Sequence, residues 1–344
     1  MTENTIPKSI KPLTKEDFES DQMVKWCPGC GDHAILKSVE KVFPALGYKK
    51  ENYAVISGIG CSSRFPYYMD TYGIHGIHGR AAAIASGVKL ANPELSVWMI
   101  TGDGDSMAIG GNHFIHLIRR NIDINVLLFN NQIYGLTKGQ YSPTTPKGQI
   151  TKTSPQGTIE HPFNPGELVI GSRGTFFARG VDMNPKLMVS IMTEAAKHDG
   201  TSIVEILQNC VIYNDKTHQL ITSKETRDDN QLIVEHGKPM IFGKNKEKGL
   251  HLNSQNKIEV VKIGENGITE DDLLIHDKYE ADPAIHLKLA NLHPPEFPAV
   301  MGVIRSTKAD TYDDLLVEQI KHEKEHSSIK TMDDLLNSGD TWEM

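Results

Sequence analysis

Cysteine is scarce in this sequence: 344 residues contain only Cys27, Cys30, Cys61 and Cys210. No apolar run approaches the roughly 20 residues of a membrane-spanning helix, and residues 1–22 lack the apolar core of a secretory signal peptide. No block of Lys and Arg occurs, and the net charge is −8, unlike a nucleic-acid-binding protein. These absences predict a cytoplasmic protein that binds neither membrane nor nucleic acid. Because thiols stay reduced in the cytoplasm, four cysteines there favour metal or redox chemistry over disulfides.

Short apolar runs alternate with amphipathic stretches between residues 23 and 212. The expected strands are 53–57, 96–101, 125–129, 175–180 and 203–207, and the expected helices are 33–46, 79–91, 106–121 and 185–198. This alternation predicts an α/β fold, a parallel sheet with helices on both faces. Residues 135–174, rich in Thr, Pro, Gly and Gln, are expected to form a functional or flexible loop.

The rest of the chain is expected to be peripheral to this domain. Residues 1–22 are polar, and residues 213–344 are predicted to form a smaller C-terminal appendage. The appendage begins with short polar strands and ends in a charged helix over 313–336. The predicted organisation is therefore one main domain, 23–212, flanked by two lesser segments.

Two polar motifs follow neighbouring predicted strands. Gly-Asp-Gly at 102–104 follows the strand 96–101, and Asn-Asn at 130–131 follows the strand 125–129. One helix and one strand fill the interval, as in a right-handed crossover, which would bring both motifs to the ligand-binding edge of the sheet. A carboxylate, an amide oxygen and phosphate oxygens suit Mg²⁺, and the glycines and the helix start suit phosphate. Each motif alone is an ordinary turn, but together they favour a metal–diphosphate site.

The four cysteines are expected at the same edge of the sheet. Cys27 and Cys30 precede the first helix in CPGCGDH, Cys61 follows the first strand in GIGCSSR, and Cys210 follows the last strand in EILQNC. Four converging thiolates would hold either a structural zinc ion or an iron–sulfur cluster. A thioredoxin-like pair would leave Cys61 and Cys210 unexplained, and four inert cysteines are a further alternative.

The motifs together resemble a known family. The Gly-Asp-Gly and Asn-Asn pair resembles the thiamine diphosphate motif. With CPGCGDH, GIGCSSR, GIHGR, YGLTKGQ and the late Cys210, the chain resembles β subunits of 2-oxoacid:ferredoxin oxidoreductases over residues 20–310, and most closely the 2-oxoglutarate branch.

That resemblance implies three cofactors and their ligands. It implies thiamine diphosphate, Mg²⁺ bound by the Asp103 and Asn131 side chains and the Ile133 carbonyl, and a [4Fe–4S] cluster bound by Cys27, Cys30, Cys61 and Cys210. The implied cofactor contacts are Gly60, Ser62, Ser63, His78, Gly79, Arg80, Gly102, Asp103, Gly104, Asp105, Asn131, Ile133, Gly135, Leu136 and Thr137.

The implied reaction is the CoA-dependent oxidative decarboxylation of 2-oxoglutarate to succinyl-CoA and CO₂. Electrons would pass through the cluster to ferredoxin, and the reaction could be reversible. Arg64 and Lys138 are the candidates for substrate contact, because two cations suit a dicarboxylate. Pyruvate or a branched-chain 2-oxo acid stays an alternative substrate. The alternative functions are a non-oxidative thiamine enzyme with a structural Cys₄ zinc and a non-catalytic, zinc-stabilised assembly subunit.

The family also implies a partner polypeptide. Thiamine enzymes need a glutamate against the aminopyrimidine ring, and in this family another chain supplies it. The sequence lacks a second domain large enough for that task and a ferredoxin-like C-x₂-C-x₂-C-x₃-C-P run. The chain is therefore expected to be inactive alone and to require an α subunit in a heterodimer or heterotetramer.

Overall fold

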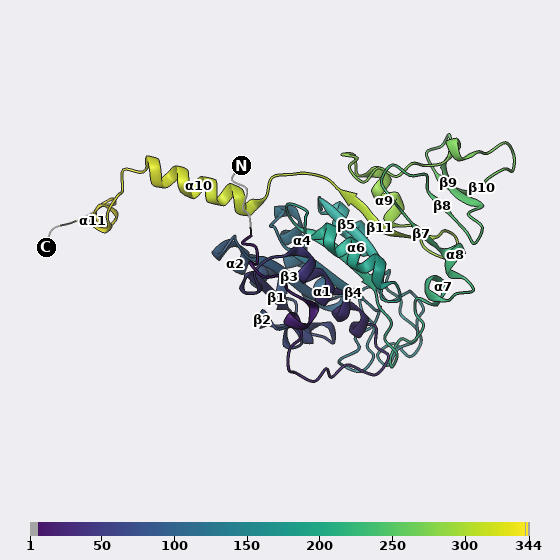
Figure 1. The fold of residues 1–344 in the computed structure, drawn as a ribbon, viewed down its shortest axis with the longest axis horizontal. Helices are drawn as coiled ribbons and strands as arrows, with labels where there is room; N and C mark the ends of the chain where they lie inside the picture. Colours follow the sequence, from purple (N-terminus) through teal and green to yellow (C-terminus); the bar gives the residue numbers. More distant parts are fainter. Residues whose placement is uncertain (1–5, 341, 343–344) are drawn as a thin grey trace.

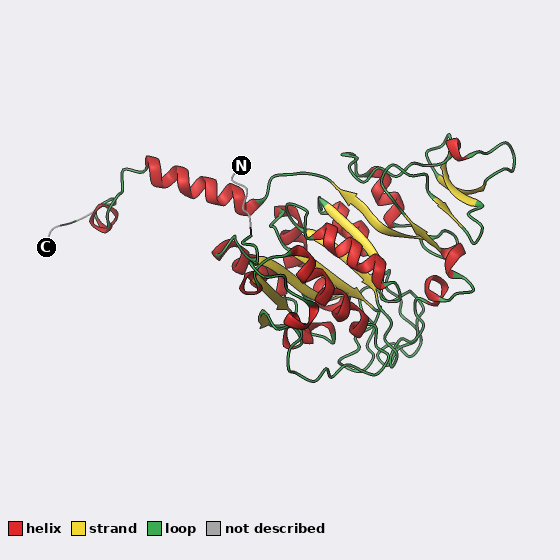
Figure 2. Cartoon of the chain, viewed as in Figure 1, coloured by secondary structure: helices red, strands yellow, loops and turns green. Residues whose placement is uncertain are grey.

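A sheet of eight strands forms the centre of the computed structural model, which describes residues 6–340 and 342 (Figures 1 and 2). The strand order is β2-β1-β3-β4-β6-β5-β11-β7. The strands are β1 (Tyr53–Ser57), β2 (Tyr72–His75), β3 (Ser96–Gly102), β4 (Asn125–Asn130), β5 (Phe176–Val181), β6 (Ser202–Leu207), β7 (Gln231–Ile233) and β11 (Ala299–Ser306). Strands β1 to β6 are parallel, and β11 runs antiparallel to β5. The predicted α/β fold class is confirmed.

Helices cover both faces of the sheet (Figure 2). One face carries α1 (Asp32–Leu46) and α6 (Pro185–Ala195), and the other carries α2 (Ala81–Ala91), α4 (Gly111–Arg120), α5 (Pro165–Gly171) and α9 (Ala284–Ala290). Side chains of a strand alternate between faces, so in β3 Trp98 packs under α1 while Val97 and Met99 join the opposite core. Both faces are apolar, and this explains the continuous apolar runs of the central strands.

The helix predicted over 106–121 is wrong as a single element. It is divided into α3 (Asp103–Met107) and α4, with a tight turn between them. Gly110 permits this turn, because a Cβ on it would lie 2.4 Å from the Asp105 carbonyl oxygen. The predicted loop 135–174 also contains α5. Asn164 caps that helix by accepting from two backbone N–H groups, and Pro165 begins it.

Residues after 212 contribute to two sheets. Strands β7 and β11 extend the main sheet, while β8 (Ile241–Phe242), β9 (Lys248–Leu252) and β10 (Ile258–Lys262) form a small antiparallel sheet. Two short helices, α7 (Gln219–Thr222) and α8 (Arg227–Asn230), precede β7. The segment 213–344 is therefore interwoven with the main sheet on one side, and the domain boundary near residue 212 stays a prediction.

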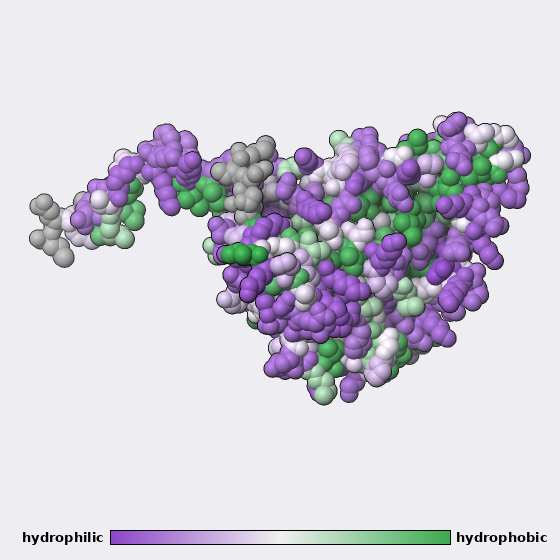
Figure 3. Space-filling view, viewed as in Figure 1, coloured by the Kyte–Doolittle hydropathy of each residue, from purple (hydrophilic) through white to green (hydrophobic). Residues whose placement is uncertain are grey.

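The C-terminal helical segment projects away from the sheet (Figure 1). The single helix expected over 313–336 is two helices, α10 (Tyr312–His326) and α11 (Met332–Leu336). Figure 3 shows that this projecting segment carries hydrophobic as well as hydrophilic side chains. Within residues 6–340 and 342, none of the helices combines the length and apolarity that crossing a membrane requires.

Candidate functional site

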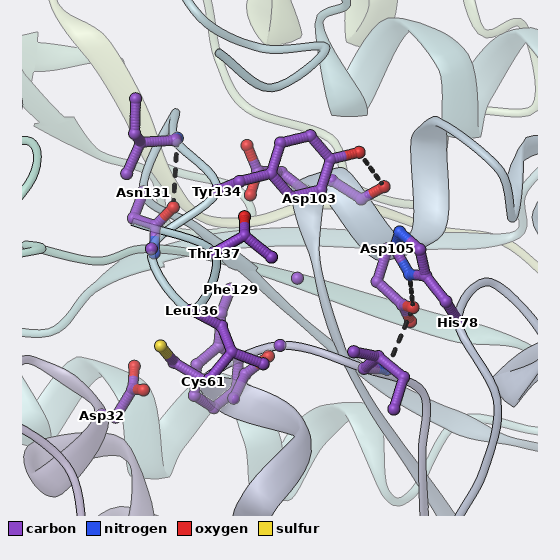
Figure 4. A pocket seen from close by; sticks show the side chains of 17 residues that line it. Asp32, Cys61, His78, Asp103, Asp105, Phe129, Asn131, Tyr134, Leu136 and Thr137 are labelled. Atoms are coloured by element: carbon purple, nitrogen blue, oxygen red, sulfur yellow. Dashed lines mark hydrogen bonds and ion pairs between the residues drawn. The ribbon is translucent and has the colours of Figure 1, made fainter. Parts of the chain in front are cut away.

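The two predicted motifs meet at one edge of the sheet. Strands β3 and β4 are hydrogen-bonded neighbours, and Gly102 pairs with Phe129 at their carboxyl ends. A cavity of about 100 Å³ opens there (Figure 4). Its walls include the following predicted residues: Gly60, Cys61, Ser62, His78, Gly102, Asp103, Gly104, Asp105, Asn131, Ile133, Gly135, Leu136 and Thr137. The structure thus brings together segments that lie far apart in the sequence.

Asp103 lies almost completely buried at the start of α3. Its Oδ2 accepts hydrogen bonds from Ser142 Oγ at 2.6 Å and Thr144 Oγ1 at 2.5 Å. Burial raises the pKa of Asp103 to about 6, while the two hydroxyl donors act in the opposite direction. The two hydroxyls hold this carboxylate in one orientation. Neither hydroxyl was predicted from the sequence, although the polar run YSPTTP at 141–146 was a signal.

A buried polar chain continues from Thr144 across the sheet. Thr144 Oγ1 lies 3.0 Å from Asn130 Oδ1, and Asn130 Nδ2 donates to Glu205 Oε1 at 2.8 Å. Glu205 Oε2 in turn accepts from Arg179 Nε at 2.7 Å. Each of these residues as a whole is at most 5% exposed. The Arg179–Glu205 ion pair on β5 and β6 therefore supports the edge of the cavity through Asn130 and Thr144.

Asp105 organises the opposite wall of the cavity. Its Oδ1 lies 2.6 Å from His78 Nδ1 (Figure 4) and accepts from the backbone N–H of Ile59 at 3.0 Å. The same oxygen also accepts from the backbone N–H of Gly79 at 2.7 Å. Its Oδ2 accepts from Thr101 Oγ1 at 2.9 Å. Both carboxylate oxygens are occupied by the protein, so Asp105 ties the loops after β1 and β2 to α3.

The Asn131 segment provides oxygen atoms on the β4 side. Asn131 Oδ1 accepts from the Ile133 N–H at 3.2 Å, which folds the chain back over the cavity. Tyr134 then lies against Gly104: its hydroxyl donates to the Gly104 carbonyl at 2.9 Å, and a Cβ on Gly104 would lie 2.2 Å from the ring. Carboxylate, amide and backbone carbonyl oxygens thus surround one small cavity, and this donor set fits Mg²⁺ and a diphosphate.

The cysteines are free thiols near the same cavity. A Cβ on Gly135 would lie 3.6 Å from the Cys61 sulfur and 3.5 Å from the Cys210 sulfur, so this glycine leaves room between them. Burial raises the pKa of Cys61 to about 12, with smaller contributions from Asp32, Cys210 and Cys27. Burial also raises the pKa of Cys30. Cys61 and Cys210 therefore lie close together beside Gly135, and thiol groups are the type of ligand that an iron–sulfur cluster takes. Within residues 6–340 and 342, no three His, Cys, Asp or Glu side chains are arranged to hold a metal ion.

Asp32 is a cavity residue that the sequence analysis missed. It follows the CPGC motif, is 2% exposed and lines the cavity beside Cys61 (Figure 4). Burial raises its pKa to about 7, and its Oδ1 has no hydrogen-bond partner among the described residues. Its position next to the cysteines in sequence was the available signal.

The other predicted residues lie behind or beside the cavity wall. Arg64 is partly buried and its Nε donates to the Tyr68 hydroxyl at 3.0 Å. Lys138 is exposed in a turn with a left-handed φ of 78°. Ser63 is fully buried, and the Arg80 guanidinium donates to the Gly79 carbonyl at 3.3 Å. Neither Arg64 nor Lys138 lines the cavity. Their contact with the substrate therefore stays a prediction.

Comparison with known proteins adds independent findings. Residues 58–206 match the family described as thiamine pyrophosphate enzyme, C-terminal TPP binding domain. The 2-oxoglutarate oxidoreductase subunit KorB of Mycobacterium tuberculosis is 45% identical over 346 residues, covering 99% of this chain and 92% of that protein. The β subunit of 2-oxoacid:ferredoxin oxidoreductase 2 of Aeropyrum pernix is 46% identical over 198 residues, which cover 58% of this chain and 64% of that protein.

A solved structure is similar over nearly the whole chain. It is the 2-oxoglutarate:ferredoxin oxidoreductase from Magnetococcus marinus with 2-oxoglutarate, coenzyme A and succinyl-CoA bound. It aligns with a TM-score of 0.77 at 30% identity and covers 98% of this chain and 100% of that chain. Because the alignment extends beyond the thiamine-binding region, the similarity includes the segment after residue 212.

Proposed function

Because the chain belongs to the family of 2-oxoglutarate and 2-oxoacid:ferredoxin oxidoreductase β subunits, we propose that it acts in the oxidative decarboxylation of 2-oxoglutarate to succinyl-CoA and CO₂. CoA is the acyl acceptor, ferredoxin takes the electrons, and a sufficiently reducing donor reverses the reaction. The observation that carries this proposal is the single cavity shared by Asp103, Asn131 and Cys61, which suits a diphosphate–metal group next to a thiolate-bound cluster.

The first role of the chain is to hold the diphosphate end of the cofactor. Asp103, Asn131 and the Ile133 carbonyl bind Mg²⁺, and the hydroxyls of Ser142 and Thr144 keep the Asp103 carboxylate aimed at the cavity. Gly102 and Gly104 line the cavity, and the missing side chain of Gly104 makes room for the Tyr134 ring. When bound, thiamine diphosphate supplies the electron sink that decarboxylation of a 2-oxo acid requires.

The second role is to place an electron acceptor beside that site. Cys27, Cys30, Cys61 and Cys210 ligate a [4Fe–4S] cluster, which supplies one-electron transfer when bound. Cys61 lines the cavity while Cys27 is exposed at the surface. The cluster site therefore extends from the cofactor wall to the protein surface, where ferredoxin docks.

The chain requires an α subunit to be active. The cavity holds groups suited to the diphosphate and metal, and the glutamate that contacts the aminopyrimidine ring is supplied by the partner. We propose that Arg64 and Lys138 attract the second carboxylate of 2-oxoglutarate at this interface. Lys138→Ala should lower the ratio of kcat/KM for 2-oxoglutarate to that for pyruvate. Lys147→Ala, an exposed lysine of the same loop, should leave the ratio unchanged. An unaltered ratio in Lys138→Ala would remove this residue from the substrate site.

Metal analysis of the α/β complex, purified without oxygen, tests the function itself. We expect about four irons and four acid-labile sulfides per chain, matching one cubane cluster, and their loss in Cys61→Ser. About one zinc without sulfide would instead support a non-oxidative thiamine enzyme with a structural site. In parallel, Asp103→Asn should abolish Mg²⁺-dependent binding of thiamine diphosphate. Asp70→Asn, at an exposed position, should not change it.

A further inference from the structure

The residue after β6 places a buried amide against a cysteine sulfur. Gln208 is 1% exposed, and its Nε2 donates to Cys30 Sγ at 3.3 Å. The same Nε2 lies 2.6 Å from the Asn209 carbonyl oxygen. An amide oxygen at that position would repel the carbonyl, so the contact determines that nitrogen, not oxygen, faces the sulfur.

The backbone around Gln208 is fitted closely to the CPGC motif. Gly31 N–H donates to the Asn209 carbonyl at 3.3 Å, and Gln208 N–H donates to the Asn130 carbonyl at 3.0 Å. A Cβ on Gly31 would lie 3.0 Å from Gln208 Cγ and 1.9 Å from Asp182 Oδ2. Glycine at residue 31 leaves the space that the Gln208 and Asp182 side chains occupy, and the bond from Gln208 to Cys30 spans 178 residues of sequence.

Packing alone does not account for a glutamine at this position. Its Oε1 is buried and has no hydrogen-bond partner among residues 6–340 and 342. A buried polar atom without a partner destabilises the fold, because it has given up its hydrogen bonds to water. Leucine, of similar size, would avoid that cost but would lose both N–H bonds, to the Asn209 carbonyl and to the Cys30 sulfur.

We propose that Gln208 is a positioning residue that raises the reduction potential of the iron–sulfur cluster through its hydrogen bond to the Cys30 sulfur. The inference rests on the proposed ligation of that cluster by Cys30. Reduction adds negative charge that spreads onto the cysteine sulfurs, so an N–H donor stabilises the reduced cluster more than the oxidised one. Gln208 thereby makes the cluster a better electron acceptor for the neighbouring cofactor site.

The test is a redox titration of the α/β complex, followed by electron paramagnetic resonance. Gln208→Leu removes the donor. At a fixed potential, the ratio of reduced to oxidised cluster should fall about tenfold, which corresponds to a midpoint potential lower by ~59 mV for one electron. Gln208→Glu keeps the shape, replaces the donor with an acceptor and should shift the potential in the same direction. Gln231→Leu is the control, because that partly buried amide donates to the Ile221 carbonyl and not to sulfur.

The outcomes separate this inference from the proposed function. Wild-type complex without iron and sulfide would refute the cluster itself. Full iron and sulfide with the wild-type midpoint potential in Gln208→Leu would refute the role of Gln208 alone. If neither variant retains iron, the test uses wild-type protein whose glutamine side chains are labelled with ¹⁵N. Electron–nuclear double resonance on the reduced cluster should then detect a ¹⁵N nucleus coupled to the cluster. Absence of that coupling in iron-replete protein would overturn the inference.

Discussion

Arg179→Met is the most informative test of how the cofactor edge is supported. Arg179 and Glu205 form an ion pair at 2.7 Å between side chains that are 7% and 2% exposed. Solvent screening is slight at this burial, so the low values typical of surface pairs do not apply. Removing the guanidinium leaves the Glu205 carboxylate buried with Asn130 as its remaining side-chain donor. Loss of one partner of a buried pair costs about 3–5 kcal/mol of folding free energy.

Urea unfolding of the α/β complex and of the isolated chain measures this cost. Arg179→Met should lower the free energy of unfolding by about 3–5 kcal/mol. Adding Glu205→Gln should restore part of it, because a neutral amide still accepts from Asn130 but no longer buries a charge. Through Asn130 and Thr144 the single variant should also weaken Mg²⁺ binding. A loss below about 1 kcal/mol, the range of exposed pairs, or a double variant no more stable than the single one, would refute the reasoning.

Three further predictions concern other positions. Gly104→Ala should displace the Tyr134 ring, because the new Cβ would lie 2.2 Å from that ring. Thiamine diphosphate binding, measured by titration, should weaken at least tenfold. Gly111→Ala is the control, because no atom lies within 4 Å of a Cβ at that position. Lys89→Met should destabilise the chain by about 2 kcal/mol in urea, because the partly buried Pro93 and Leu95 carbonyls and the Asp123 carboxylate lose their lysine donor. No loss of stability would contradict this. Burial lowers the pKa of His198 to about 4, below its unfolded value near 6.5. The stability from this residue is full above pH 6.5 and is lost as pH falls toward 4. The pH dependence of the urea midpoint should flatten over that window in His198→Gln, and an unchanged slope would show that His198 is not responsible.

Much of the site follows from local sequence and the topology of parallel sheets. The sequence alone shows an apolar run followed by Gly102-Asp103-Gly104 and a second run followed by Asn130-Asn131. Since parallel strands joined by a helix must run in the same direction, their carboxyl ends lie at one edge. Five strands were therefore predicted within one or two residues, and the motifs lie where the prediction placed them.

Contacts between distant loops could not be predicted in the same way. Ser142 and Thr144 reach Asp103 across 39 and 41 residues through a loop without regular periodicity. The break at Gly110 depends on a close approach to the Asp105 backbone, which helical periodicity does not reveal. Strand β11 was assigned to an appendage, because its apolar pattern does not specify β5 as its partner.

The sequence by itself determined the fold class and the family and predicted the oxygen and sulfur donors of the site, because these depend on residue type and on position relative to strand ends. Only the tertiary structure decided which side chains support those donors. The hydroxyls on Asp103, the Arg179–Glu205 brace and the amide on Cys30 are all non-local contacts. Such contacts depend on where loops and strands pack in space, and short-range sequence patterns do not specify that packing.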